Sequence, residues 1–238
     1  MIRNIHKPVM LEEVISFIPK EKKLNIIDAT FGGGGYSKLL LENFEIKNLI
    51  AIDRDPMTKS FSNSIKKKFP KKFNLINGCF SNIDNLIKEF YDDKKNIFFD
   101  AIIFDLGLSS NQLEDSNRGF SFLRDNPLDM NMGSSNILAS DIINKYTEKQ
   151  IADIIYNFGE DRNARKIAKI IVKNRKIKKI KSSLELSNLI SNKITDKKRK
   201  NFKINPATKT FQALRIYVND ELNELKIDLK KSESLLAP

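Results

Sequence analysis

The sequence predicts an α/β protein, in which a doubly wound parallel sheet is interrupted by an inserted all-helical domain. Two observations predict the sheet: short apolar runs alternate with helical periods over residues 24–104, and a glycine-rich turn follows the first run. A third predicts the insertion, because Lys and Arg gather in a later segment that lacks strand-like runs. We expect residues 1–113 and 206–238 to form the core and residues 114–205 to form the helical domain.

The predicted strands are rich in Ile, Leu or Phe, and each ends beside Asp or Gly. They cover residues 24–29, 49–52, 73–76 and 98–104. The helices between them cover residues 36–44, 57–69 and 83–91. Since parallel strands need crossover connections, this alternation predicts a βαβαβαβ series.

Helical patterns dominate the second half of the chain. Thr147 and Gln150 are spaced as a capping box, and apolar residues recur on one face of residues 151–158. Two further helices are expected within residues 164–194. Apolar residues at spacings of three and four over residues 211–229 predict one long amphipathic helix that packs back on the sheet.

The positive charge is concentrated in one segment. Residues 161–210 hold 17 Lys or Arg against three acidic residues, a net charge of +14, whereas the whole chain carries +12. The remainder is therefore slightly acidic, at −2. This contrast favours a localised surface that binds the phosphates of RNA or DNA, and a solvated lysine-rich helix face is the alternative.

Cysteine and histidine usage excludes several classes. The single cysteine, Cys79, forms no internal disulfide, and with the single histidine, His6, it is too few for a usual zinc cluster. No metal is expected. The apolar runs are too short for a membrane span and no secretory signal is recognised, so a cytoplasmic protein is predicted. The oligomeric state stays open, with a homodimer among the alternatives.

Four consecutive glycines begin at Gly32, between the first strand and a helix that starts near Tyr36. Glycines there permit positive φ and close approach of a ligand to the backbone, while the helix start offers free N–H groups. A tight turn without a ligand is one alternative. Binding of NAD or FAD is another, because the motif roughly resembles the dinucleotide fingerprint.

Polar and aromatic residues follow the other strands. Asp53 ends the second strand, 18 residues after Gly35, which suits a carboxylate that accepts ribose hydroxyls. Asp28 either faces the positive end of a ligand or caps the turn, and Phe80 either contacts an adenine or lies in the core. Asp105 follows the fourth strand, where open sheets place their chemistry. This order of features suits methyltransferases better than dehydrogenases.

Longer motifs carry a resemblance to one family. They read "HKPVMLEEV", "DATFGGGGYS", "AIDRDP", "FDLGLSSNQLEDSNRGFSFLRDNPLDMNM", "FGEDRNARKIAKIIV" and "NPATKTFQALRIYVNDEL". Together they closely resemble the bacterial MraW or RsmH family, which methylates N4 of a cytidine in the 16S rRNA of the small ribosomal subunit. The resemblance implies a Rossmann-like core of the class I methyltransferases and S-adenosylmethionine as cofactor. The cofactor contacts that it implies are Gly34, Gly35, Tyr36, Asp53, Phe80, Asp105 and Gln112.

The sequence departs from the family pattern in two places. Tyr36 stands where the family usually has His, so a side-chain contact with the cofactor is expected to differ. Family members also usually continue beyond "LLAP" with a glycine turn, further strands and a basic tail. The closing part of the sheet is therefore expected to be missing from this sequence.

Catalytic and RNA-binding roles follow as hypotheses. Asp105 would orient the cofactor or the amine, and Ser109, Ser110 and Asn111 would line a cytosine pocket, with helix or loop capping as the alternative. The expected RNA contacts are Arg118, Arg124, Arg162, Arg165, Lys209 and Arg215. Two other functions remain open, a non-catalytic RNA-binding assembly factor and an NAD-dependent oxidoreductase.

Overall fold

The computed structural model describes residues 9–238 except 21, 92–96, 116, 134 and 195–203. The chain divides into two compact units. The first comprises Met1–Asn111 with Leu222–Pro238, and the second comprises Gln112–Glu221. The sequence predicts a helical domain over residues 114–205, and its recognition of RNA stays a prediction.

A parallel four-stranded sheet forms the centre of the first unit, in the order β3-β2-β1-β4. Its strands are β1 (Leu24–Asp28), β2 (Ile46–Asp53), β3 (Phe73–Asn77) and β4 (Ala101–Ile103). The central pairing is in register from Ile26 opposite Leu49 to Asp28 opposite Ala51. Most residues of these strands are apolar because both faces of the sheet are covered.

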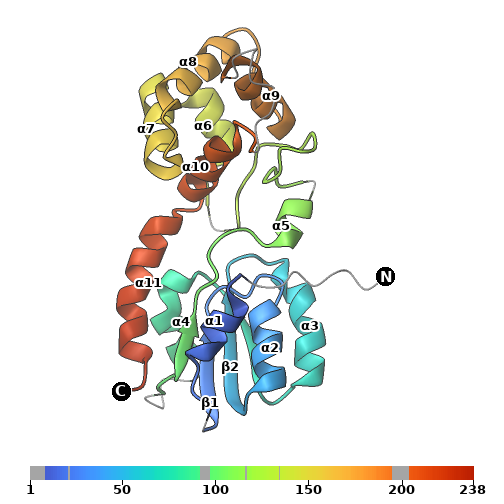
Figure 1. Cartoon of the computed structure of the whole chain (residues 1–238), viewed down its shortest axis with the longest axis vertical. Helices are drawn as coiled ribbons and strands as arrows, with labels where there is room; N and C mark the ends of the chain where they lie inside the picture. The colour runs from blue at the N-terminus through green and yellow to red at the C-terminus, as the bar shows by residue number, and fades with distance from the viewer. Residues whose placement is uncertain (1–8, 21, 92–96, 116, 134, 195–203) are drawn as a thin grey trace. The chain divides into compact units, whose positions relative to one another are not determined.

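Helices cover both faces of the sheet. They are α1 (Leu11–Ser16), α2 (Gly35–Asn43), α3 (Thr58–Lys68), the short η1 (Phe80–Asn82) and α4 (Ile83–Phe90). α1, α2 and α3 pack on one face around Leu24 and Ile26, and α4 packs on the other around Ile27 and Ile50. Figure 1 shows α2 and α3 on one side of the strands and α4 on the other. This arrangement confirms the predicted α/β fold class.

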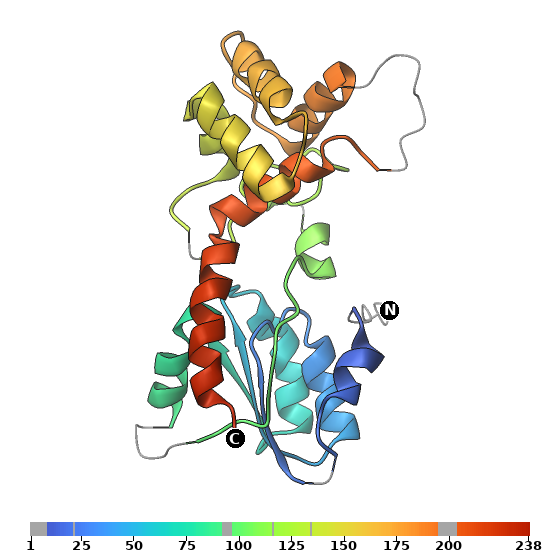
Figure 2. The ribbon, with the colours of Figure 1, turned by 60° about the vertical axis from the view of Figure 1, so that its left-hand side comes forward.

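The last residues of the chain extend the edge of this sheet. The backbone N–H of Phe99 donates to the carbonyl of Leu235 at 2.9 Å, and the N–H of Ala237 donates back to Phe99 at 2.9 Å. A parallel bridge joins Phe99 to Leu236. The preceding helix α11 (Glu221–Leu235), red in Figure 2, thereby reaches the sheet beside β4.

The second unit is helical within its described residues. A short helix, α5 (Ser110–Glu114), lies at its boundary, and the others are α6 (Ala139–Lys145), α7 (Glu148–Gly159), α8 (Ala164–Arg175), α9 (Ser183–Ile194) and α10 (Thr208–Val218). The predicted capping box at the start of α7 is confirmed. The N–H of Gln150 donates to the Thr147 hydroxyl at 3.3 Å, and the N–H of Thr147 donates to the Gln150 amide oxygen at 2.9 Å.

The prediction of one long helix over residues 211–229 is wrong. The helix is interrupted at Asn219 and Asp220. Asp220 takes a φ of 50°, in the left-handed region that Asp tolerates better than most residues. The Asn219 side chain reinforces the break, because it accepts the N–H of Met132 at 2.8 Å and donates to the carbonyl of Met130 at 2.8 Å. α10 therefore packs within the helical unit, and α11 alone reaches the sheet.

Candidate functional site

The glycine turn after β1 is packed too closely to accept a side chain at one position. Gly32 and Gly34 have φ values of 52° and 79°. A Cβ at Gly34 would come within 2.8 Å of Ile65 and 2.9 Å of Phe31, both of which are buried. Helix α2 begins directly afterwards at Gly35 with no side chain capping its first N–H groups. The N–H groups of Gly32 and Gly34 donate to Asp53 and to the carbonyl of Phe31. The donors that would suit an anionic or polar ligand group are therefore those at the start of α2.

Asp53 holds this turn from the end of β2. Its Oδ2 accepts the N–H of Gly32 at 2.7 Å, and its Oδ1 accepts the N–H of Asp55 at 2.8 Å. Burial raises the pKa of Asp53, although both bonds and the Arg54 charge oppose the rise. A carboxylate accepts about four hydrogen bonds, so each oxygen keeps acceptor capacity for a ligand hydroxyl.

Asp28, the last residue of β1, contacts residues on both sides of the glycine turn. It is 1% exposed, its Oδ2 accepts the Ser37 hydroxyl at 2.6 Å, and its Oδ1 accepts the N–H of Thr30 at 3.4 Å. Burial raises the pKa of Asp28 to about 6, and the charges of Asp53 and Asp105 add to the rise. Asp28 therefore braces the start of α2 in this structure, and its contact with a ligand stays a prediction.

Tyr36 points into the first unit. It is 5% exposed, and its hydroxyl donates to the carbonyl of Val9 at 2.6 Å. Burial raises the pKa of Tyr36, and the charge of Asp105 adds to that effect. The backbone of Tyr36 lies in the first turn of α2, and its contact with a cofactor stays a prediction.

The segment after β4 returns to the glycine turn. Asp105 is exposed, and its N–H donates to the Thr30 hydroxyl at 2.6 Å. A Cβ built at Gly32 would lie 3.5 Å from Cβ of Ser109, and one built at Gly33 would lie 3.2 Å from Nδ2 of Asn111. Three of the four residues predicted to be catalytic thus lie around the residues that follow β1. Ser110 is partly buried and begins α5.

Phe80 lies in η1, directly after β3, and is partly buried. Its ring meets Phe104 edge to face with centroids 6.1 Å apart, and the Arg54 guanidinium lies 5.9 Å from its centroid. The ring therefore has neighbours directly after β4 and directly after β2. An adenine contact at Phe80 stays a prediction.

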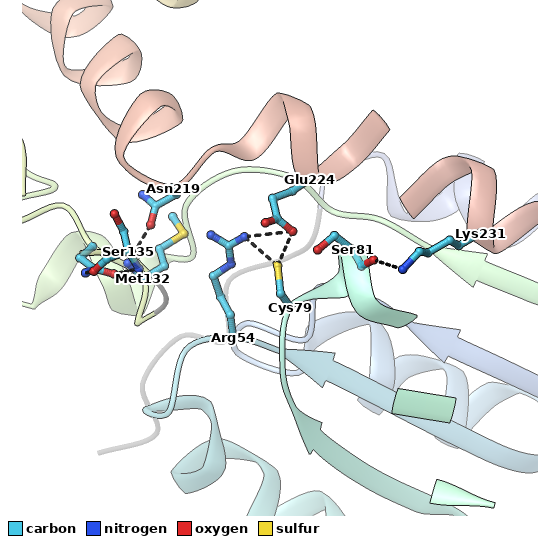
Figure 3. A network of polar contacts seen from close by, with 9 residues as sticks. Arg54, Cys79, Ser81, Met132, Ser135, Asn219, Glu224 and Lys231 are labelled. Carbon is cyan, nitrogen blue, oxygen red and sulfur yellow. Dashed lines mark hydrogen bonds and ion pairs between the residues drawn. The ribbon is translucent and has the colours of Figure 1, made fainter. Parts of the chain in front are cut away.

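A polar cluster that the sequence did not predict joins the ends of β2 and β3 to α11 (Figure 3). The Cys79 thiol donates to Glu224 at 2.6 Å. Arg54, whose side chain is 8% exposed, donates to the Cys79 sulfur at 2.8 Å and lies 3.7 Å from Glu224. Burial and the Glu224 carboxylate raise the pKa of Cys79. Arg54 follows Asp53 directly and could have been singled out on that ground, whereas no local pattern marks Glu224.

The six cations predicted to bind RNA fall into two groups. Arg118 donates to the carbonyl of Asn131, Lys209 donates to the carbonyl of Glu160 at 2.9 Å, and Arg215 forms a two-point ion pair with Glu221 at 2.8 and 2.9 Å. These three have partners within the second unit. Lys209 is exposed nonetheless, as are the other three: Arg124, Arg162 and Arg165.

The structure shows where the remaining predicted residues lie but does not test their roles. Gln112 lies in α5 and belongs to the second unit, so its contact with a cofactor stays a prediction. His6 lies outside the described residues. Within the described ranges, no three His, Cys, Asp or Glu side chains gather closely enough to hold a metal ion. Among the same residues, none of the helices combines the length and apolar character that crossing a membrane requires.

The comparisons with known proteins agree over nearly the whole chain. Among curated proteins, "Ribosomal RNA small subunit methyltransferase H" of Wolbachia sp. subsp. Drosophila simulans is 45% identical over 98% of this chain and 77% of its own length. The proteins of the same name in Neorickettsia sennetsu and Rhodospirillum rubrum are each 42% identical, over 98% and 97% of this chain and 75% and 68% of their own lengths. The model of the MraW methylase family matches residues 3–238, and the chain belongs to that family.

Proposed function

We propose that this protein transfers a methyl group from S-adenosylmethionine to N4 of a cytidine in 16S rRNA, and that it acts on the small ribosomal subunit in the cytoplasm. The observation that carries the proposal is the junction of Asp53 with Gly32, beside Asp105 and Thr30, in a chain of the MraW methylase family. The relatives' names specify an rRNA of the small subunit as the molecule that they methylate. The site described above offers the groups that such a reaction needs.

The residues around the glycine turn fit the cofactor. Asp53 is fixed by two N–H groups and keeps lone pairs for two ribose hydroxyls. A 2′-phosphate in that place would face a carboxylate rather than an Arg fork, so an unphosphorylated ribose is favoured. Phe80 would supply an apolar face for adenine, and Asp105, which is exposed, would supply negative charge near the sulfonium.

When bound, S-adenosylmethionine supplies an electrophilic methyl group on its sulfonium. The cytosine amine would take that methyl group as the carbon–sulfur bond broke, and a proton would have to leave N4. Asp105 would accept that proton or hold the amine in line, because its backbone is tied to Thr30 at 2.6 Å while its side chain is exposed. Ser109, Ser110 and Asn111 would position the base.

The target base must leave its stack to reach such a site. Unstacking costs a few kcal/mol, and the cost falls for a nucleotide that is already unpaired. Folded rRNA offers such nucleotides, which favours it over a regular duplex. Phe120 and Phe122 lie between Arg118 and Arg124, where aromatic rings could stack on RNA bases. They could do so only in part, since Phe120 is buried and Phe122 packs against Phe211 with ring centroids 5.1 Å apart.

The test is a methyl-transfer assay with tritiated cofactor on small subunits that lack the modification, followed by mass mapping of the labelled nucleoside. We expect label on N4 of one cytidine. For Asp105→Ala we expect a loss of rate of about 10²- to 10⁴-fold. Retention of both cofactor binding and methyl transfer in that variant would remove the role of Asp105. Subunit binding without any transfer by the unchanged protein would support the non-catalytic assembly factor instead.

A further inference from the structure

Exposed cations form a stripe along α8. Arg165, Lys169 and Lys173 of α8 and Lys176, which directly follows it, recur at intervals of four, four and three residues, and all four are exposed. Such spacing keeps them on one face of the helix over about 16 Å of its axis, since each residue rises about 1.5 Å. We call these four residues the α8 stripe. The opposite face of α8 is buried and apolar: Ala164, Ile167, Ala168 and Ile171.

The charge of the α8 stripe is not neutralised within the described residues. α8 contains no acidic residue, and none of the four cations forms an ion pair with a described side chain. Arg175 differs, because it donates to the carbonyls of Ile143 and Tyr146 and so braces the end of α6. Lys178 differs too, since it lies 3.7 Å from Glu185. Arg175 and Lys178 therefore have partners among the described residues, whereas the four cations of the stripe face solvent.

We propose that the α8 stripe is a docking surface for the phosphate backbone of the rRNA substrate. Successive cations four residues apart lie about 6 Å apart along the helix, so one strand can follow them with several phosphates in contact. Arg162 and Lys166, both exposed, flank the stripe and widen the positive surface. The identity of the RNA rests on the proposed function, whereas the surface itself rests on the geometry of α8.

An anionic membrane fits this surface less well than RNA does. Helices that bind at a lipid interface insert an apolar face between the headgroups, with cations on the polar side. The apolar face of α8 is instead buried in the second unit, where Ile167 and Ile171 are 0% exposed. The stripe can thus offer charge alone, which is what sequence-independent contact with phosphates requires.

The test compares two triple variants that remove the same charge. One is Arg165→Gln, Lys169→Gln and Lys173→Gln on the stripe. The control is Lys59→Gln, Lys67→Gln and Lys71→Gln, which changes exposed lysines of the first unit. Binding of each protein to a 16S rRNA transcript is measured at several salt concentrations, with circular dichroism and thermal unfolding to check folding. Vesicles of phosphatidylserine and phosphatidylcholine, and the methyl-transfer assay, are run on the same samples.

We expect the stripe variant to bind the transcript at least about tenfold more weakly. Its negative slope of log affinity against log salt concentration should become shallower by about 2 to 3, while the slope of the control stays unchanged. Equal slopes for the two folded variants would overturn the docking surface, even if methyl transfer is observed. Loss of vesicle binding without loss of rRNA binding would overturn it in favour of a membrane. If the slope becomes shallower as expected but the unchanged protein transfers no methyl group, the docking surface stands and the proposed function fails.

Discussion

Asp53 accepts the N–H of Gly32 through Oδ2 at 2.7 Å, so the end of β2 and the glycine turn after β1 are joined by one hydrogen bond. The same carboxylate is the group that we expect to hold the ribose. Removing its charge should therefore affect the ligand directly and the turn indirectly. This double role makes Asp53 the most informative position in the first unit.

Asp53→Asn should weaken S-adenosylmethionine binding by at least about tenfold, because hydrogen bonds to a charged group contribute about 1.5–3 kcal/mol. Isothermal titration calorimetry measures the effect. The control is Asp125→Asn, which removes one negative charge from an exposed position. Equal cofactor affinity in both variants would show that Asp53 serves the fold alone.

Cofactor binding should also weaken as the medium becomes acidic. Burial raises the pKa of Asp53, and ribose hydroxyls donate to its ionised form, so protonation of Asp53 competes with the cofactor. The affinity should be highest at neutral pH and should decline from a pH above the ordinary range of an Asp side chain. Titrations from pH 8 to pH 5 test this, with Asp53→Asn as the reference. A decline of the same size in that variant would assign the pH dependence to another group.

Gly34→Ala should lower both the stability of the first unit and its affinity for the cofactor. A φ of 79° costs an alanine about 1–2 kcal/mol, and the new methyl group would press on the buried side chains of Phe31 and Ile65. The matched control is Gly33→Ala, where the new Cβ would lie 3.2 Å from Asn111 and φ is not positive. Chemical denaturation should show a loss of about 2 kcal/mol or more for Gly34→Ala and a smaller one for Gly33→Ala. Similar losses would contradict the packing argument.

Asp228 provides a stability prediction that depends on pH. It is 0% exposed, and burial raises its pKa to about 7, with the charges of Asp84 and Glu224 adding to the rise and Ser232 and Lys231 opposing it. Because the folded pKa lies above the unfolded value of 3.8, the ionised carboxylate destabilises the fold at high pH. That cost is complete above about pH 7 and disappears as the pH falls towards 3.8.

Asp228→Asn should accordingly be more stable than the unchanged protein at pH 8, by about 1–2 kcal/mol, and this advantage should shrink as the pH falls through 7. Urea unfolding at pH 8, 7, 6 and 5 measures the difference. Asp153→Asn, at an exposed position of α7, is the control. A stability difference for Asp228→Asn that grows towards acid pH would have the wrong sign.

Local patterns in the sequence were sufficient for the sheet and for the residues around the glycine turn. Parallel strands bring their carboxyl ends to one edge, so Asp53, Gly32 and Asp105 could be placed near one another from strand order alone. The capping box at Thr147 was equally accessible, because both of its partners lie within one helical turn. Predictions of this kind succeed where the interacting residues are close in sequence or where the fold class fixes their meeting point.

Other features depend on contacts that no local period encodes. The apolar spacing continues through Asn219 and Asp220, and the helix breaks there because Asn219 binds the backbone of Met130 and Met132, about 90 positions earlier. Figure 3 shows the contact between Asn219 and Met132. The pair of Cys79 and Glu224 spans 145 positions, so its chemistry could not be read from either neighbourhood. The same holds for charge. The composition indicated a basic segment, but it could not show which cations bind other residues of the protein and which face solvent.

Gly159 tests how closely α7 and α10 must approach. A Cβ at this position would lie 2.4 Å from the carbonyl oxygen of Lys209 and 3.2 Å from Cβ of Ala213, so the two helix backbones meet where Gly159 has no side chain. Alanine favours a helix by about 1 kcal/mol over glycine, whereas overpacking of a close contact costs about 1–3 kcal/mol. Because a carbonyl oxygen on a packed helix cannot move like the end of a side chain, we expect the clash to win.

Gly159→Ala should therefore destabilise the second unit by about 1–2 kcal/mol despite its better helix propensity. Asn157→Ala, at an exposed position of the same helix, isolates propensity and should stabilise by a few tenths of a kcal/mol. Denaturant unfolding and amide hydrogen exchange in α7 and α10 report both changes. If Gly159→Ala instead stabilised the protein as Asn157→Ala does, α7 and α10 would have room for a methyl group, and their close approach would not depend on the glycine.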